Sequence, residues 1–186
     1  MAKNIAIFAS GGGSNAEVII EHFKNSNKGN IALIVTNNAR AGVINRAENH
    51  NIPFYILDKG ELEENEFSEV LEAMDIDFVV LAGFLKKIPN DILLAYPNRI
   101  VNIHPALLPK FGGKGMYGYH VHEAVVKAQE KESGMTIHYV NANYDEGAII
   151  EQHKVALTGA ETPDQVAEKV LALEHAFYAP CIDRLL

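Results

Sequence analysis

The sequence predicts a three-layer α/β fold, in which a doubly wound, mostly parallel sheet carries an antiparallel strand pair in the C-terminal half. Short apolar runs alternate with helical patterns as far as residue 103, which is typical of βαβ units. The runs are apolar throughout, as in parallel strands that are buried on both faces. Segments 136–140 and 148–152 are also strand-like. Only seven residues separate them, too few for a parallel crossover, so they should pair antiparallel.

Apolar spacing and turn residues place the elements in order. The expected strands are 5–9, 31–35, 52–56, 78–82, 99–101, 136–140 and 148–152. The expected helices are 16–23, 43–50, 61–74, 89–96, 120–131 and 162–177. Pro89 suits the first turn of its helix, and Thr162-Pro163 forms a strong helix start. Because no linker or repeat interrupts the chain, we expect a single domain over 1–186.

Composition and charge narrow the class of partner. The chain has 186 residues and a net charge of −8 without a cluster of lysine or arginine, which argues against nucleic acid. Cys181 is the only cysteine, so no intrachain disulfide forms and the cytoplasm is the expected compartment. The N-terminus runs directly into a five-residue apolar stretch, too short for a signal peptide or a membrane span, so we expect no membrane partner.

A glycine-rich turn, Ser10-Gly11-Gly12-Gly13-Ser14-Asn15, follows the first expected strand and opens the first helix. Glycines let the backbone approach a ligand closely, and the first amides of a helix lack acceptors within it. The turn is therefore a candidate phosphate site. It is not a dinucleotide fingerprint, since Ala16 stands at the third glycine, nor a Walker A loop, which needs Gly-Lys-Ser/Thr. A tight turn without a ligand is the alternative.

The stretch 101–109, Val-Asn-Ile-His-Pro-Ala-Leu-Leu-Pro, places Asn102 and His104 on one face of a strand that ends in a proline-fixed loop. Histidine can relay a proton, and Asp145, in the turn between the two antiparallel strands, would raise its pKa and orient it. An asparagine amide can donate to an oxyanion. These residues suit attack of an amine on an acyl carbon. Taken singly, each also fits a structural role at a strand end, in a turn or in a half-buried position.

The other histidines predict no metal site. His120 and His122 would diverge by about 200° at a helix start, because each residue advances by about 100°. No cysteine or third histidine stands near them to complete a ligand set. His138, on the strand before Asp145, could support the site. The histidines expected on the surface without partners are His22, His50 and His153.

Four motifs occur together in this chain. They are Ser-Gly-Gly-Gly-Ser-Asn at 10–15, Leu-Ala-Gly-Phe at 81–84, Asn-Ile-His-Pro-Ala-Leu-Leu-Pro at 102–109, and Asp-Glu-Gly at 145–147 before an Ile-Ile strand. In combination they resemble the folate-dependent formyltransferase family, from residue 3 to about residue 180. The resemblance implies a formyltransferase-like fold, with 1–100 as the nucleotide-phosphate-binding half and 101–186 as the catalytic and folate-binding half.

The resemblance also implies a role for each matching residue. Catalysis would rest with Asn102, His104 and Asp145. The residues that would bind a ribonucleotide acceptor are Gly13, Ser14 and Asn15 at its phosphate and Glu174 at its glycinamide. The residues that would bind the folate, largely through backbone groups to the pterin, are Leu85, Lys86, Lys87, Ile88, Asn102, Asn141 and Asp145.

The chain departs from the family pattern in three places. Lys86 stands where many relatives carry arginine. Segment 111–119 is longer and richer in glycine than usual. It is either a mobile surface loop or a segment that orders on substrate binding, with Lys114 approaching the phosphate. No arginine stands within 57–66 to meet the glutamate tail of the folate.

The implied reaction transfers a formyl group from the co-substrate 10-formyltetrahydrofolate to the amine of 5'-phosphoribosylglycinamide, in de novo purine synthesis. It would proceed by direct attack without a metal, in a cytoplasmic monomer or weak homodimer that binds small molecules. One alternative is a formyltransferase for methionyl-tRNA or an amino sugar, although the acidic charge disfavours tRNA. The other is a non-catalytic nucleotide-binding module, which the intact Asn102, His104 and Asp145 set disfavours.

Overall fold

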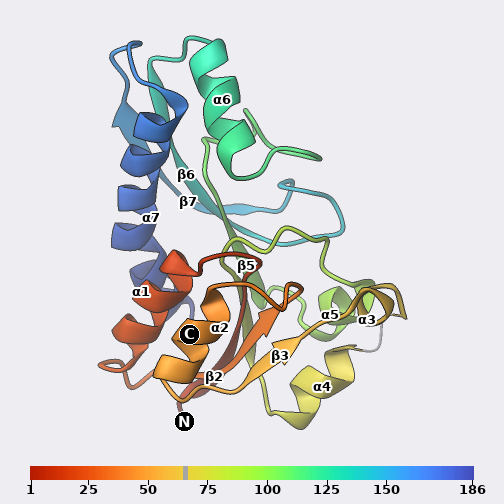
Figure 1. The fold of residues 1–186 in the computed structure, drawn as a ribbon. Coiled ribbons are helices and arrows are strands. Elements are labelled where there is room, and N and C mark those ends of the chain that lie inside the picture. The colour runs from red at the N-terminus through yellow and green to blue at the C-terminus, as the bar shows by residue number, and fades with distance from the viewer. Residues whose placement is uncertain (65–66) are drawn as a thin grey trace. The chain divides into compact units, whose positions relative to one another are not determined.

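A computed structural model describes residues 1–64 and 67–186 (Figure 1). The described chain divides into two compact units, the first made of residues 1–101 and 179–186 and the second of residues 102–178. Parallel strands fill the first unit, and an antiparallel pair belongs to the second. This arrangement confirms the expected mixed, mostly parallel α/β class.

The first unit contains neighbouring parallel strands in the order β3-β2-β1-β4, and β5 comes next in the order. The strands are β1 (Lys3–Phe8), β2 (Gly29–Thr36), β3 (Phe54–Ile56), β4 (Phe78–Leu81) and β5 (Ile100–His104). Ile5 of β1 pairs with Ile31 on one side and Phe78 on the other and is fully buried. Strands covered on both faces need apolar side chains throughout, which explains the continuous apolar runs of the sequence.

The helices of the first unit pack in two groups. Helix α1 (Ser14–Phe23) packs against α2 (Val43–Asn49), and both contact β2. Helix α3 (Lys59–Glu64) precedes α4 (Phe67–Ala73), which packs against α5 (Asn90–Ala95). The sequence predicted one helix over 61–74, and α3 and α4 are helical at 61–64 and 67–73 of that range. Residues 65 and 66, between them, lie outside the described residues.

The strand order of the first unit creates a switch point between β1 and β4. The chain leaves β1 to build β2 and β3 on one side and then returns to build β4 on the other side. Open α/β sheets bind ligands at the carboxyl ends of the strands that flank such a point. Segment 9–15 follows β1 and segment 82–88 follows β4. Phe84 anchors the second segment by packing edge-to-face on Phe8, with ring centroids 5.3 Å apart.

The second unit is built around the antiparallel pair β6 (Glu132–Tyr139) and β7 (Ile149–Ala156), with helix α6 (Tyr119–Lys127). The expected antiparallel pairing is confirmed, but both strands extend beyond the predicted segments. The ladder reaches from His138, paired with Ile149, back to Glu132, paired with Ala156. Polar residues and a glycine occupy 132–134, so the apolar pattern did not reveal this part of β6.

Helix α7 (Pro163–Leu185) is longer than the sequence predicted, and the expected end near residue 177 was wrong. The helix continues through Pro180, which lacks the N–H needed for an intrahelical bond. Burial of the final turns offsets that cost, because Tyr178, Cys181 and Ile182 are at most 1% exposed. None of the helices in the described parts of the chain has the length and apolar character needed to cross a membrane.

Candidate active site

The glycine-rich turn lies at the expected place in the first unit, between β1 and α1. Gly13 caps α1 in the left-handed conformation, with φ 69° and ψ 31°. A Cβ atom on Gly13 would lie 2.7 Å from Cγ2 of Val43, so both the backbone and the space require glycine. The first amide groups of α1 have no acceptor within the helix, and together with the positive end of the helix dipole they favour an anion. The geometry therefore suits the predicted phosphate site.

Ser10 connects the turn to the segment after β4. Its hydroxyl donates to Oδ1 of Asn37 at 2.5 Å and accepts from the backbone N–H of Leu85 at 2.9 Å. Leu85, Lys86 and Lys87 are exposed, whereas Ile88 is buried. Ser10 thus ties the beginning of the glycine-rich turn to the beginning of the 85–88 segment within the first unit.

His104 and Asp145 meet in the second unit. The Nε2 atom of His104 donates to the carbonyl oxygen of Phe111 at 2.7 Å, because a carbonyl can only accept. In the neutral imidazole the basic lone pair is therefore on Nδ1, which lies 3.5 Å from Oδ2 of Asp145. His104 is only 3% exposed. The structure thus presents a buried imidazole whose proton-accepting nitrogen faces a carboxylate.

His138 supports Asn102 and lies beside the same carboxylate. Its Nδ1–H donates to the carbonyl of Tyr139 at 2.8 Å, so its Nε2 accepts from the Nδ2 amide of Asn102 at 3.1 Å. The same Nε2 lies 3.6 Å from Oδ1 of Asp145. One N–H of the Asn102 amide is therefore used internally, and the second can donate to a ligand.

The start of segment 111–119 holds Asp145 in place. The backbone N–H of Gly113 donates to Oδ2 of Asp145 at 2.9 Å. Asp145 has a positive φ of 57°, a conformation that aspartate tolerates better than most residues. Gly112 fits because a Cβ there would lie 2.5 Å from Cδ2 of Leu108 and 3.3 Å from Cβ of Asp145. The residues after the proline-fixed loop are thus part of the cluster.

Burial and charge set the protonation states of the cluster. Burial lowers the pKa of His104, and the opposing effects of Asp145 and the Phe111 carbonyl do not outweigh it. The sequence led us to expect that Asp145 would raise the pKa of His104. Asp145 does act in that direction, but the pKa is lowered overall because burial has the larger effect. Burial alone would raise the pKa of Asp145, but His138, His104 and the Gly113 amide together lower it. The cluster therefore rests as a neutral imidazole beside an ionised carboxylate.

The remaining expected residues lie in different surroundings. Asn141 is exposed, and its Oδ1 accepts from the backbone N–H of Asn143 at 2.9 Å in the turn before Asp145. Glu174 lies on α7 and is buried. Ser14 and Asn15 form the first residues of α1 and are partly exposed.

Several supporting residues could not be found by sequence reasoning. Thr136 donates to the carbonyl of Ala106 at 2.6 Å and accepts from the N–H of Leu108 at 3.0 Å, so it fixes the loop after His104. The sequence predicts His50 on the surface without a partner. The structure instead places it 2.8 Å from Glu17, with its side chain 12% exposed. These contacts join residues that are far apart in the sequence, and only the fold brings them together. The apolar pattern of the sequence therefore could not predict them.

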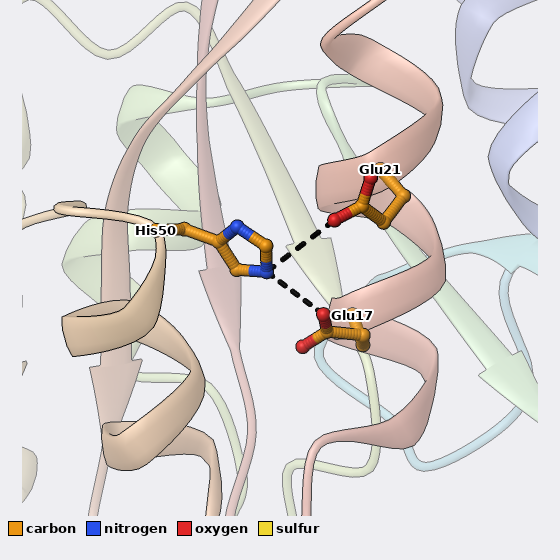
Figure 2. Close-up of side chains that lie close together, drawn as sticks. All are labelled: Glu17, Glu21 and His50. Atoms are coloured by element: carbon orange, nitrogen blue, oxygen red, sulfur yellow. Dashed lines mark hydrogen bonds and ion pairs between the residues drawn. The ribbon is translucent and has the colours of Figure 1, made fainter.

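The described residues contain one group of three side chains with metal-ligating atoms close together: Glu17, Glu21 and His50 (Figure 2). Its carboxylates already have cationic partners, Arg46 at 2.9 Å from Glu17 and Lys24 at 2.6 Å from Glu21. These ion pairs make the group a poor cation site and point to a structural use.

Similarity to known proteins extends over nearly the whole chain. The sequence profile of the formyl transferase family matches residues 3–182. Phosphoribosylglycinamide formyltransferase from Bacillus subtilis is 35% identical over 190 residues, covering 99% of this chain and 95% of that protein. Its chloroplastic counterpart from Arabidopsis thaliana is 42% identical over 187 residues, covering 97% of this chain and 64% of that protein. This chain thus spans less than two thirds of the length of its plant relatives.

Among solved structures, phosphoribosylglycinamide formyltransferase from Bacillus halodurans has a TM-score of 0.90 and 40% identity, covering 99% of this chain and 95% of that one. The fold and the site define a doubly wound α/β protein with an amide, an imidazole and a carboxylate suited to acyl transfer. Since the family profile spans nearly the whole sequence, the chain belongs to the formyl transferase family.

Proposed function

We propose that this protein transfers a formyl group from 10-formyltetrahydrofolate to the amine of 5'-phosphoribosylglycinamide, a step of de novo purine synthesis. The cluster of Asn102, His104 and Asp145 carries the proposal, because Asp145 faces the buried proton-accepting nitrogen of His104 and also lies beside His138, the hydrogen-bond partner of Asn102. Family membership and relatives named for this activity support the choice of donor and acceptor. Residues 1–100 would then supply the phosphate site, and 101–186 the catalytic groups.

The chemistry is attack of the free acceptor amine on the formyl carbon attached to N10 of the folate. A bond forms between the amine nitrogen and the formyl carbon, and the formyl oxygen becomes an oxyanion. The second N–H of the Asn102 amide would donate to that oxyanion, and protonated His104 would add its charge. The C–N10 bond then breaks. Attack by the amine itself requires no nucleophile from the protein.

The proton released by the attacking amine would pass to Nδ1 of His104. This atom carries the lone pair because Nε2–H is bound to the carbonyl of Phe111. Asp145, held by the Gly113 amide, stabilises the imidazolium that forms. His104 would then return the proton to N10 as that nitrogen leaves. A low resting pKa keeps the imidazole neutral and ready to accept.

The phosphate of the acceptor would bind the amides at Gly13, Ser14 and Asn15, and Glu174 would meet its glycinamide group. The folate would lie against Leu85 to Ile88, Asn102, Asn141 and Asp145. The protein would act on small molecules as a cytoplasmic monomer or weak homodimer, without a metal. Light scattering at working concentrations would test the oligomeric state.

The test is turnover. Purified protein given phosphoribosylglycinamide and 10-formyltetrahydrofolate should form formylated acceptor. The change in folate absorbance and mass spectrometry both detect this product. The same rate is expected in the presence of a chelator. Absence of turnover here, combined with turnover on methionyl-tRNA or an amino sugar, would overturn the choice of acceptor.

A further inference from the structure

Two consecutive carbonyl groups of the glycine-rich turn are tied to α2. The carbonyl of Gly11 accepts from the backbone N–H of Val43 at 3.1 Å. The carbonyl of Gly12 accepts from Nε of Arg46 at 2.6 Å. In a trans peptide the C=O and the following N–H point in opposite directions. The N–H groups of Gly12 and Gly13 are therefore turned away from α2, which leaves them available to a ligand.

The Gly12–Gly13 peptide is one of two peptides in this turn that have glycine on both sides. Glycine on both sides leaves the peptide plane able to rotate at little steric cost. A rotation would replace the outward N–H of Gly13 by the carbonyl of Gly12, and a carbonyl oxygen repels an anion. The bond from Arg46 opposes this rotation because it holds the carbonyl on the side of α2.

Arg46 is itself fixed by a chain of side chains that link α1 to α2. Its Nη1 lies 2.9 Å from Oε2 of Glu17. Figure 2 shows the next contact, in which Oε1 of Glu17 lies 2.8 Å from Nε2 of His50. Glu21 lies 3.6 Å from the same His50 nitrogen. The hydrogen bond from His50 is the main cause of the lowered pKa of Glu17, and Arg46 adds to it. Glu17 is therefore ionised at neutral pH and holds the guanidinium.

We propose that Arg46 is a positioning residue for the phosphate of the acceptor, which keeps the Gly13 amide directed at that phosphate. The guanidinium acts from the opposite side of the peptide, and Glu17 and His50 fix its position. This inference rests on the proposed function, because that function supplies the phosphate. It also gives Glu17, one member of the group in Figure 2, a use other than metal binding, because its carboxylate orients an arginine.

The experiment compares Arg46→Met with Lys24→Met. Both changes remove a cation that is paired with a carboxylate of α1, but only Arg46 reaches the turn. Each variant is assayed with phosphoribosylglycinamide and with the same acceptor lacking its phosphate. For Arg46→Met we expect KM for the phosphorylated acceptor to rise by roughly 3- to 10-fold, the scale of one hydrogen bond. The kcat and the KM for the formyl folate should stay within about twofold, and Lys24→Met should match the wild type.

Phosphate specificity separates positioning from a general loss of structure. In Arg46→Met, the preference for the phosphorylated acceptor over the acceptor without phosphate should fall. The factor should equal the loss of affinity for the phosphorylated acceptor. Arg46→Lys should recover only part of this preference, because one ammonium cannot reproduce the planar fork of donors. Glu17→Gln should shift the preference in the same direction by a smaller factor. An unchanged KM, or an equal loss on both acceptors, would overturn the inference.

A binding measurement keeps this result distinct from the proposed function. If the wild type does not turn over phosphoribosylglycinamide, the proposed function fails, and ribose 5-phosphate then serves as the probe. Titration followed by amide NMR should move the Gly12 and Gly13 signals of the wild type and show weaker binding to Arg46→Met. Equal binding by both proteins, or no shift of these signals in the wild type, would contradict a positioning role.

Discussion

The glycine-rich turn of the first unit and the Asn-His-Asp cluster of the second are polar sites built in opposite ways. In the turn the backbone offers the ligand groups, and a side chain, Arg46, orients them from behind. In the cluster the side chains act, and the backbone orients them through the carbonyl of Phe111 and the amide of Gly113. A backbone site is sensitive to a Cβ added where it clashes or where φ is positive, as at Gly13, whereas a side-chain site is sensitive to chemical type.

Because of this difference, we expect substitutions in the glycine-rich turn and in the Asn-His-Asp cluster to affect different kinetic constants. An amide site that binds a phosphate remote from the reacting atoms contributes chiefly to acceptor affinity. A proton-accepting imidazole beside an oxyanion donor contributes chiefly to the chemical step. Substitutions in the turn should therefore change KM, and those in the cluster should change kcat.

The largest expected effect is in the cluster. His104→Ala should lower kcat by ~100-fold or more, because it removes both the proton acceptor and a positive charge near the oxyanion. Asp145→Asn should cause a loss of similar size. The exposed His120, paired with Glu123 at 3.4 Å, provides the control, and His120→Ala should retain the wild-type rate. Steady-state kinetics decide the matter, and a near-normal kcat for His104→Ala would remove the proposed mechanism.

The next effect is in the turn. Gly13→Ala places a methyl group 2.7 Å from Val43 at a φ of +69°, so the turn must distort. We expect KM for phosphoribosylglycinamide to rise at least about tenfold, as amide hydrogen bonds to the phosphate are lost, with a smaller change in kcat. A methyl group on Gly11 would meet nothing within 4 Å, so Gly11→Ala is the matched control. A fall in kcat without a change in KM would contradict the division of roles.

A smaller effect concerns the support of the cluster. Thr136→Val leaves the N–H of Leu108 and an amide N–H of Gln152 without their acceptor. Thermal or denaturant unfolding should show a loss of about 2 kcal/mol, the scale of an unsatisfied buried group. Ser133, on the same strand, has a buried hydroxyl without a hydrogen-bond partner in the described part of the chain. Ser133→Ala should therefore be close to neutral, and an equal loss in both variants would disprove the specific role of Thr136.

The smallest effect is a shift in pH dependence. Burial holds the pKa of His104 below its usual 6.5, so kcat/KM should decline only at pH values below 6.5 as the base becomes protonated. Asp145 acts to raise this pKa, so Asp145→Asn should lower it further and move the acid limb to lower pH, in addition to reducing the rate. Measurement of kcat/KM against pH tests the sign, and a move to higher pH would contradict the assigned electrostatics.

The sequence predicted features that depend on neighbouring residues. The glycine-rich turn, the parallel strands and the antiparallel pairing of β6 and β7 follow from local pattern and spacing. Asn102 and His104 could be chosen together because two residues apart on a strand share a face. Asp145 could be chosen from its turn, but the pattern could not establish its distance from His104.

The sequence did not reveal contacts between distant segments. The sequence named His138 as a supporting residue but did not reveal that it contacts both Asn102 and Asp145. Glu17 and His50 come from different segments, α1 and the end of α2. The net direction of the His104 pKa also depends on burial, which only the folded structure shows. The sequence pattern places Pro180 beyond the last helix because proline disfavours helix interiors, but burial of the final turns prevails.

The most direct test of this division of roles is a crystal structure of the protein with phosphoribosylglycinamide. We expect phosphate oxygens within hydrogen-bond distance of the backbone amides at Gly13, Ser14 and Asn15, with the Gly12 carbonyl still bound to Arg46. A phosphate held instead by the side chains of Lys86 and Lys87, with no contact to the turn amides, would contradict this expectation.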